Sequence, residues 1–409
     1  MLEPGAIEPS YAALLRVPGF ARVVLGTLLA RLGGAMWEIV LVLFVLQRYR
    51  SPSLAGLAVL LAIFPGLALS PVAGALLDRQ GRVRLMIFDY AVTAGLLATI
   101  VALSVGHRLP PPLLLVIVSV LGVSNILSIT GARSLFPLML PRPLWDRANG
   151  LDSSMYSLTA VFGPALAGIL VARFGPEAGL LVTGGVAAIA CVSLIGVKEP
   201  IARTDSKGSL IGDAWAALLY VLRHRSLRSL AITLFLANLG FGVIPVGIPV
   251  LVLQHLHGSA ATVGQIFAVV GLAGLTAGLL VGRISTEGRE RTLVAIAIAI
   301  QVPALVLLAF TRSLLVVFAI AFIAGGAGSV INVAIFALRQ RRTDPAWFGR
   351  AFAVSMSFNF AGAPIGSALS GPLLEHSIAL PLLLGAAVTL VAVAAALLLI
   401  PGQESAEAR

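Results

Sequence analysis

Charged residues are scarce in this chain: they make up 11% of its 409 residues, whereas a soluble globular protein carries about 25%. Its single cysteine, Cys191, lies inside an apolar run, which excludes a disulfide framework and a cysteine-based metal site. The histidines and acids lack metal-ligand spacing, and no G-x-x-x-x-G-K-[ST] loop is present to bind ATP. We therefore expect no metal, no cofactor and no enzymatic activity.

Apolar residues, in contrast, form 59% of the chain and gather in long runs. A helix needs about 20 such residues to cross the roughly 30 Å core of a bilayer. The sequence predicts an all-α membrane protein with twelve transmembrane helices, near residues 21–46, 53–77, 85–106, 113–136, 148–172, 178–197, 229–254, 261–282, 292–310, 313–337, 350–374 and 378–400.

Positive charge is distributed unevenly between alternate loops. With the N-terminus in the cytoplasm, 22 of the 28 Lys and Arg residues fall on the cytoplasmic side, five fall on the opposite side, and Arg31 lies inside a span. The positive-inside rule then predicts a multi-pass protein of the cell (inner) membrane with both termini cytoplasmic. The net charge of +11 is spread over short loops and not over a basic domain, so we expect no nucleic-acid partner.

The two halves of the chain resemble each other at an offset of about 203 residues. This offset relates Arg147 to Arg350, Gly163 to Gly366 and Gly168 to Gly371. It predicts two pseudo-symmetric six-helix bundles, over residues 1–200 and 229–409, joined by a cytoplasmic linker at 201–228 that carries an amphipathic helix. Parallel repeats of this kind occur in transporters whose halves rock about a central site, and we expect a monomer.

The loop after the second span, "GALLDRQGRVRL", resembles the signature loop of the major facilitator superfamily, G-x-L-x-D-R-x-G-R-R. The matching residues are Gly74, Leu76, Asp78, Arg79, Gly81 and Arg82, whereas Val83 departs from the pattern. The resemblance covers essentially the whole chain. It implies the twelve-helix fold of that family and secondary transport of a small molecule.

In that family the loop aspartate rests against the start of span eleven when the transporter is open to the outside. A carboxylate gains about 0.3–1 kcal/mol near the partial positive charge of a helix N-terminus. We therefore expect Asp78 to act as a latch of the cytoplasmic gate near Phe348–Arg350; an ordinary capped turn is the alternative. We assign to this gate Gly74, Asp78, Arg79, Gly81, Arg82, Asp89 and Arg133, the last two as charge partners.

Span five is similar to the corresponding span of the drug:proton antiporter group that contains macrolide and siderophore exporters. Gly150, Gly163, Pro164 and Gly168 match the exporter motif of that span, whereas Thr159 and Ala167 replace two glycines. The alternative is ordinary helix packing, since small residues are common wherever membrane helices meet.

Two charges lie inside span one. Arg31 and Glu38 are seven residues apart and share one face of the helix. Charges at this depth are costly and usually face a cavity. We predict that Glu38 carries the coupling proton and that Arg31 tunes its affinity; a static Arg31–Glu38 pair is the alternative.

Polar and aromatic residues of several spans are candidates for the substrate cavity: Met36, Trp37, Asn125, Asn238, Asn332, Phe241 and Phe358. Each asparagine is also able to bond a neighbouring helix, for about 0.6 kcal/mol, and for any one asparagine this simpler interpretation is favoured. Most of the aromatic residues of the spans would face lipid or pack between helices.

The features together predict proton-coupled efflux of amphipathic or lipophilic small molecules by alternating access. Its partners would be a small-molecule substrate, protons and the lipid bilayer. One alternative is a mover of lysophospholipids or other lipids with the same fold. A non-transporting sensor would need a sizeable soluble domain, and the linker is too short to be one.

Overall fold

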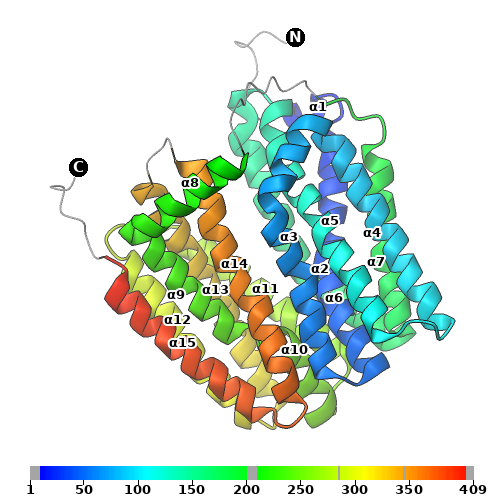
Figure 1. Cartoon of the computed structure of the whole chain (residues 1–409), viewed down its shortest axis with the longest axis vertical. Coiled ribbons are helices and arrows are strands. Elements are labelled where there is room, and N and C mark those ends of the chain that lie inside the picture. The colour runs from blue at the N-terminus through cyan, green and yellow to red at the C-terminus, as the bar shows by residue number, and fades with distance from the viewer. Residues whose placement is uncertain (1–9, 200–209, 284–285, 344–346, 402–409) are drawn as a thin grey trace. The chain divides into compact units, whose positions relative to one another are not determined.

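The computed structural model describes residues 10–199, 210–283, 286–343 and 347–401. In these residues the chain is α-helical, with short 3-10 and π-helical turns and with no strand. Figure 1 shows the helices in chain order from blue to red. The all-α membrane fold predicted from the apolar runs is confirmed.

The first six predicted spans are six long helices, preceded by a short helix α1 (Tyr11–Arg16). They are α2 (Phe20–Tyr49), α3 (Pro52–Gln80), α4 (Arg82–Val105), α5 (Pro111–Met139), α6 (Trp145–Phe174) and α7 (Pro176–Leu194). A single 3-10 turn, Arg142–Leu144, precedes α6.

The second half begins with α8 (Leu210–Arg223), which has a strongly one-sided apolar face and coincides with the amphipathic helix predicted in the linker. The later helices are α9 (Arg225–Phe241), α10 (Ile244–Val250), α11 (Ala260–Val281), α12 (Glu290–Phe310), α13 (Leu314–Arg342), α14 (Phe348–Leu374) and α15 (Ala379–Leu399).

Proline and glycine set several helix boundaries. Pro52, Pro111 and Pro176 each occupy the first position of a helix, where the missing N–H of proline costs nothing. Gly81 and Gly175 precede α4 and α7 with φ of +92° and +85°, angles that side-chain-bearing residues rarely adopt. The chain therefore turns sharply at these points and starts the next helix at once.

The seventh span differs from the prediction of one continuous helix over 229–254. It is divided into α9, α10 and a π-helical turn, Leu251–His255. Pro249 lies inside α10 and cannot donate a backbone hydrogen bond. At the break, the carbonyl of Gly242 accepts a hydrogen bond from Ser367 Oγ at 2.6 Å, so a side chain of α14 satisfies the interrupted backbone.

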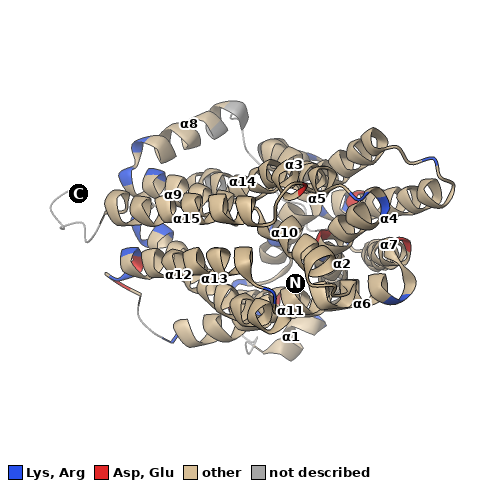
Figure 2. Ribbon diagram, turned by 90° about the horizontal axis from the view of Figure 1, so that it is seen from below, with Lys and Arg blue, Asp and Glu red and all other residues tan. Residues whose placement is uncertain are grey.

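Eleven segments of the described chain are long and apolar enough to cross a membrane. The helix α14, of 27 residues, occupies the position of the remaining predicted span. Figure 2 shows that Lys, Arg, Asp and Glu are sparse along the long helices. The length and the composition of the helices are therefore those of a twelve-helix membrane protein.

Contacts divide the chain into two compact units. The first unit comprises residues 1–40 and 61–207, and the second comprises 41–60 and 208–409. The hairpin at 41–60 joins the second unit because α3 approaches α14 closely: a Cβ on Gly56 would lie 2.2 Å from the Ser367 carbonyl oxygen. The sequence repeat places residues 1–200 in one bundle and does not indicate that residues 41–60 contact the second unit.

Within the first unit the helices also meet at glycines. A Cβ on Gly66 of α3 would lie 2.3 Å from the carbonyl oxygen of Gly122 on α5. A Cβ on Gly163 of α6 would lie 2.5 Å from that of Ala35 on α2. Close backbone approach of this kind is how membrane helices gain packing energy in the absence of a hydrophobic driving force.

Candidate functional site

A small cavity of about 60 Å³ lies inside the first unit, between helices α2, α3, α4, α5 and α7. Its polar and aromatic lining comes from Trp37, Asp89, Tyr90, Thr93, Asn125, Ser128 and Thr183. Gly33 and Gly34 form part of its wall, where the absence of side chains leaves the space open. Two of the residues predicted for a substrate cavity, Trp37 and Asn125, are thus brought together here.

Asp89 of α4 is the acidic group of this cavity. Its side chain is 2% exposed, and its Oδ1 accepts a hydrogen bond from the hydroxyl of Ser124 on α5. The hydroxyls of Ser128 and Thr93 lie within hydrogen-bonding reach of it. Hydroxyl donors stabilise a buried carboxylate but leave its charge uncompensated.

The predicted pairing of Asp89 with Arg133 is absent from the ion pairs of the described residues. Asp89 faces the cavity, whereas Arg133 is exposed. The helical periodicity of α4 turns position 89 toward α5 and α7, which are its main packing neighbours. Asp89 therefore belongs to the interior site and not to the gate to which the sequence assigned it.

Arg31 of α2 pairs with Asp152 of α6 and not with Glu38. The distance from its Nη2 to Asp152 Oδ1 is 2.9 Å, and its Nη1 donates to the Asp152 backbone carbonyl at 2.8 Å. Its guanidinium also lies 4.5 Å from the centre of the Tyr156 ring, within range of a cation–π interaction. Three contacts on one helix thus fix the position of Arg31.

Glu38 lies one turn beyond Gly34 on α2 and its side chain is exposed. Met36, on another face of the same helix, is 1% exposed and packs in the core. The static Arg31–Glu38 pair, which was the alternative to proton coupling, is absent, since Arg31 pairs with Asp152. Met36, predicted for the substrate cavity, does not line the cavity of the first unit.

In the second unit, Asn238 of α9 bonds a neighbouring helix, which is the simpler of the two readings considered for it. Its Nδ2 donates to Asn359 Oδ1 of α14 at 2.9 Å and to the Leu234 carbonyl at 2.9 Å. Asn332 and Phe358 are exposed and Phe241 is half-buried. Asn238 therefore joins α9 to α14, while Asn332 and Phe358 remain accessible.

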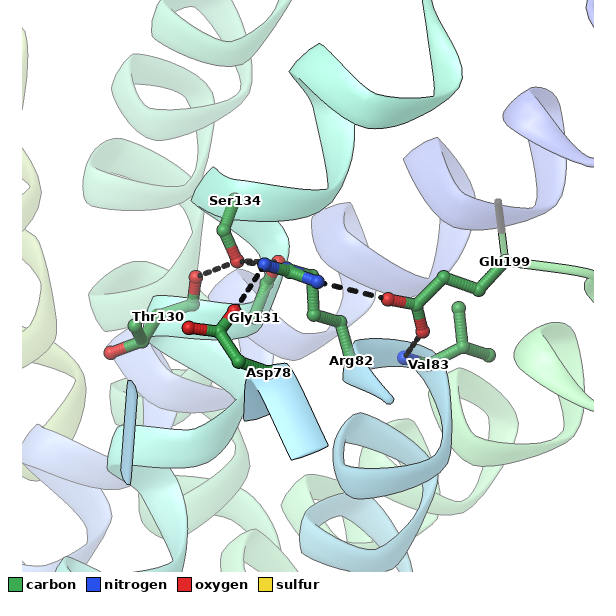
Figure 3. A network of polar contacts seen from close by, with 7 residues as sticks. All are labelled: Asp78, Arg82, Val83, Thr130, Gly131, Ser134 and Glu199. Atoms are coloured by element: carbon green, nitrogen blue, oxygen red, sulfur yellow. Dashed lines mark hydrogen bonds and ion pairs between the residues drawn. The ribbon is translucent and has the colours of Figure 1, made fainter. Parts of the chain in front are cut away.

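The loop between α3 and α4 contains a polar network, drawn in Figure 3. The guanidinium of Arg82 pairs with Asp78, four residues earlier, and with Glu199 Oε1 at 3.2 Å. Its Nε donates to Ser134 Oγ of α5 at 3.0 Å. Glu199 Oε2 also accepts from the backbone N–H of Val83 at 3.1 Å, so this carboxylate caps the start of α4.

The other predicted gate residues occupy different environments. Gly81 takes a positive φ, and a Cβ there would lie 3.2 Å from Glu199 Oε2. Gly74 has open space around it, and Arg79 is exposed. The side chains of Phe348–Arg350, the predicted counterpart of Asp78, lie outside the described residues.

The span-five motif lies on α6, in the first unit. Gly163, Pro164 and Gly168 are buried, and Gly163 packs against Ala35 of α2. Gly150 lies near the start of the helix, where a Cβ would be 3.2 Å from the Tyr11 hydroxyl. Within the motif, Gly163 thus allows α2, the helix of Arg31, to approach α6 closely.

Sequence reasoning assigned no role to Glu199, Ser124 or Asp152. Glu199 lies in a polar stretch that reads as linker, and serine inside a span carries little signal. Asp152 had one available sign: it lies four residues before Tyr156, so both share a helix face on which a cation is able to bind.

The sequence of the chain matches one known family. The sequence model of the Major Facilitator Superfamily matches residues 23–345 and 230–409. The chain belongs to this superfamily. Its members are transporters of small molecules and not enzymes, and the family resemblance of the α3–α4 loop is confirmed.

Several relatives align with almost the whole of this superfamily member. It is 36% identical over 395 residues to "Uncharacterized MFS-type transporter y4rN" of Sinorhizobium fredii, covering 96% of this chain and 97% of that one. It is 25% identical to the "Multidrug efflux pump Tap" of Mycobacterium tuberculosis, covering 88% of each chain. The crystal structure of the nucleoside transporter NupG matches with a TM-score of 0.74 at 12% identity, covering 94% of this chain and 99% of that one, which shows a shared fold.

Proposed function

We propose that this superfamily member is a proton-coupled exporter of amphipathic or lipophilic small molecules, working by alternating access in the cell (inner) membrane with both termini cytoplasmic. The observation that carries the proposal is the similarity to the multidrug efflux pump Tap over 88% of the chain. The exporter-type sequence of α6 and the acids within the spans support it. The charge asymmetry of the loops supports the orientation.

Proton coupling requires an acid whose proton affinity changes between two states. Burial of a carboxylate favours its protonated form, whereas contact with water or a cation favours ionisation. We propose Glu38 for this role because it lies in the middle of the apolar helix α2 and its side chain is exposed in this structure. Arg31, held by Asp152, supplies a fixed positive charge two turns away on the same helix.

Asp78 is proposed to act as the latch of the cytoplasmic gate. In this structure its carboxylate pairs with Arg82 and its side chain is 39% exposed. In the alternate state it would move to the N-terminus of α14, where the helix dipole stabilises a carboxylate. Two alternative partners for one acid give the gate two stable positions.

The test is transport by purified protein in liposomes under an imposed pH gradient. The panel contains lipophilic cations, neutral macrolides and lysophospholipids, and a pH-sensitive dye records proton movement with each. We expect counter-movement of protons with amphipathic drugs. Transport that is unaffected by the gradient would overturn proton coupling, and transport of lysophospholipids alone would identify a lipid transporter in its place.

A further inference from the structure

The cavity of the first unit contains one charged side chain among its described lining residues, and that charge is negative. Asp89 is 2% exposed, and its described partners are the hydroxyls of Ser124, Ser128 and Thr93. The described ion pairs include none with Asp89, and Arg31 of α2 is bound to Asp152. A buried ionised carboxylate without a counter-charge is costly, so the cavity favours a bound cation or a proton.

The size of the cavity selects among cations. A volume of about 60 Å³ holds several waters but falls far short of the roughly 300–1,000 Å³ that a drug-sized ligand occupies. It therefore suits one end of a larger molecule. Gly34 of α2 borders the cavity, and nothing lies within 4 Å of the place where its Cβ would be, which leaves room there for a chain attached to that end.

The aromatic residues of the lining favour an organic cation over an inorganic one. Trp37 and Tyr90 both border the cavity, and aromatic faces attract organic cations in partly dry sites by about 0.5–2 kcal/mol. Asn125 adds an amide oxygen that accepts hydrogen bonds from an ammonium. A carboxylate, an amide and two aromatic residues around a small space form a suitable receptor for an aliphatic ammonium group.

We infer that this cavity binds the ammonium group of a cationic amphiphile, with Asp89 as its counter-ion and Trp37 and Tyr90 as its aromatic walls. The inference rests on the proposed function, since it names the substrate class of that exporter: molecules with an aliphatic amine at one end and an apolar body. The apolar body lies outside the cavity.

A proton competes with the ammonium group for Asp89, because either one neutralises the carboxylate. The cation Arg31 of α2 is bound to Asp152. The groups around Asp89 are Tyr90 and Thr93 on its own helix α4, Ser124, Asn125 and Ser128 on α5, and Thr183 on α7. Among these described groups, Asp89 is the one that ionises in the acidic range. Ammonium binding is therefore expected to weaken as the pH falls.

Direct binding to the purified full-length protein in detergent tests the inference, with hexylammonium chloride as the probe and with hexan-1-ol and hexanoate as neutral and anionic analogues of equal length. Isothermal titration calorimetry is run against empty micelles. We expect saturable binding of hexylammonium at neutral pH, at least tenfold tighter than either analogue. Equal affinity for hexan-1-ol, or no saturable binding of hexylammonium, would overturn the inference.

Two variants locate the site. Asp89→Asn is expected to weaken hexylammonium binding at least tenfold, whereas Asp146→Asn, at an exposed acid of α6, leaves it unchanged. Unaltered binding by a folded Asp89→Asn protein contradicts the inference. If that variant does not fold, as judged by size exclusion and thermal unfolding, Trp37→Leu decides: its affinity should fall severalfold, and an unchanged affinity rejects the site.

This measurement does not depend on transport. Ammonium binding at Asp89 without proton-driven efflux would leave the binding site in place and remove the exporter function. Proton-driven efflux with no ammonium binding would support the exporter function and exclude the ammonium site.

Discussion

Glu199 binds Arg82 through one carboxylate oxygen and the start of α4 through the other. Its Oε1 lies 3.2 Å from Arg82 Nη1, and its Oε2 accepts from the Val83 N–H at 3.1 Å. The two side chains are 16% and 10% exposed, so the pair is largely shielded from solvent. A segment that follows α7 therefore fixes the turn between α3 and α4.

Glu199→Gln should destabilise the first unit. The substitution removes the charge that pairs with Arg82 and weakens the cap on α4, and charge-assisted hydrogen bonds of this kind contribute about 1.5–3 kcal/mol. Thermal unfolding in detergent measures the effect, with Asp146→Asn as the exposed control. An unfolding temperature equal to that of the wild type would mean that solvent screens the pair.

Asp78→Asn should leave folding and membrane insertion intact and reduce transport at least tenfold. The amide cannot pair as an ion with Arg82 or respond to the dipole of α14, so both proposed positions of the latch are weakened together. Transport by proteoliposomes is compared with the amount of folded protein in the same vesicles. Full transport by this variant would exclude the latch.

Glu38→Gln should abolish transport driven by a pH gradient and spare exchange of substrate against substrate. The amide mimics the protonated acid, so the carrier still binds and reorients but no longer releases a proton. Both modes are measured in the same liposome preparation. If the pH dependence of the variant matches that of the wild type, another acid carries the proton.

Gly66→Val should be strongly destabilising and Gly95→Val nearly neutral, although both glycines lie inside spans. A Cβ at Gly66 meets the Gly122 carbonyl at 2.3 Å, whereas nothing lies within 4 Å of a Cβ at Gly95. Overpacking of this kind costs about 1–3 kcal/mol. Thermal unfolding compares the two variants, and similar unfolding temperatures would show that α3 is able to move away from α5.

Glu375 should stabilise the second unit at neutral pH, and this contribution should be lost in acid. Its Oε1 accepts from the Ser53 N–H at 3.2 Å and from Ser51 Oγ at 3.0 Å, and the hydrogen bonds from Ser53 and Ser51 lower its pKa below the usual 4.5. A lowered pKa contributes stability above the unfolded value that is lost as the pH falls through the folded value.

The measurement is the unfolding temperature of wild type and of Glu375→Gln at about pH 7 and about pH 3.5. At about pH 7 the wild type should unfold at a higher temperature than Glu375→Gln, and at about pH 3.5 this difference should disappear. An advantage that persists in acid would assign the contact to hydrogen bonding without charge.

The helices were predictable because each needs an uninterrupted apolar run, and such runs are local in the sequence. The prolines of the seventh span are also local, but the hydrogen bond that satisfies its interrupted backbone comes from Ser367, which lies far along the chain from Gly242. The partner of Arg31 was missed for the same reason. Helical spacing offered Glu38 as the alternative partner, whereas the structure pairs Arg31 with Asp152, 121 residues away.

The residues of the cavity were likewise predictable in part. Trp37 and Asn125 were chosen for their chemistry and do line the cavity. Asp89 was placed at the gate because it follows the loop closely in sequence, yet the rotation of α4 turns it inward. A single sequence does not fix the rotation of a helix that is apolar on most of its surface, and α4 is of that kind.

The anchor on the α3–α4 turn also has a consequence for biosynthesis. Glu199 follows Arg82 by 117 residues, so at translation rates of about 5–20 residues per second the ribosome supplies it roughly 6–23 s later. During that interval α4 to α7 emerge, and Arg82 has Asp78 as a partner from the start and Ser134 once α5 has been made. The nascent turn is thus completed after all six of the first long helices have been made.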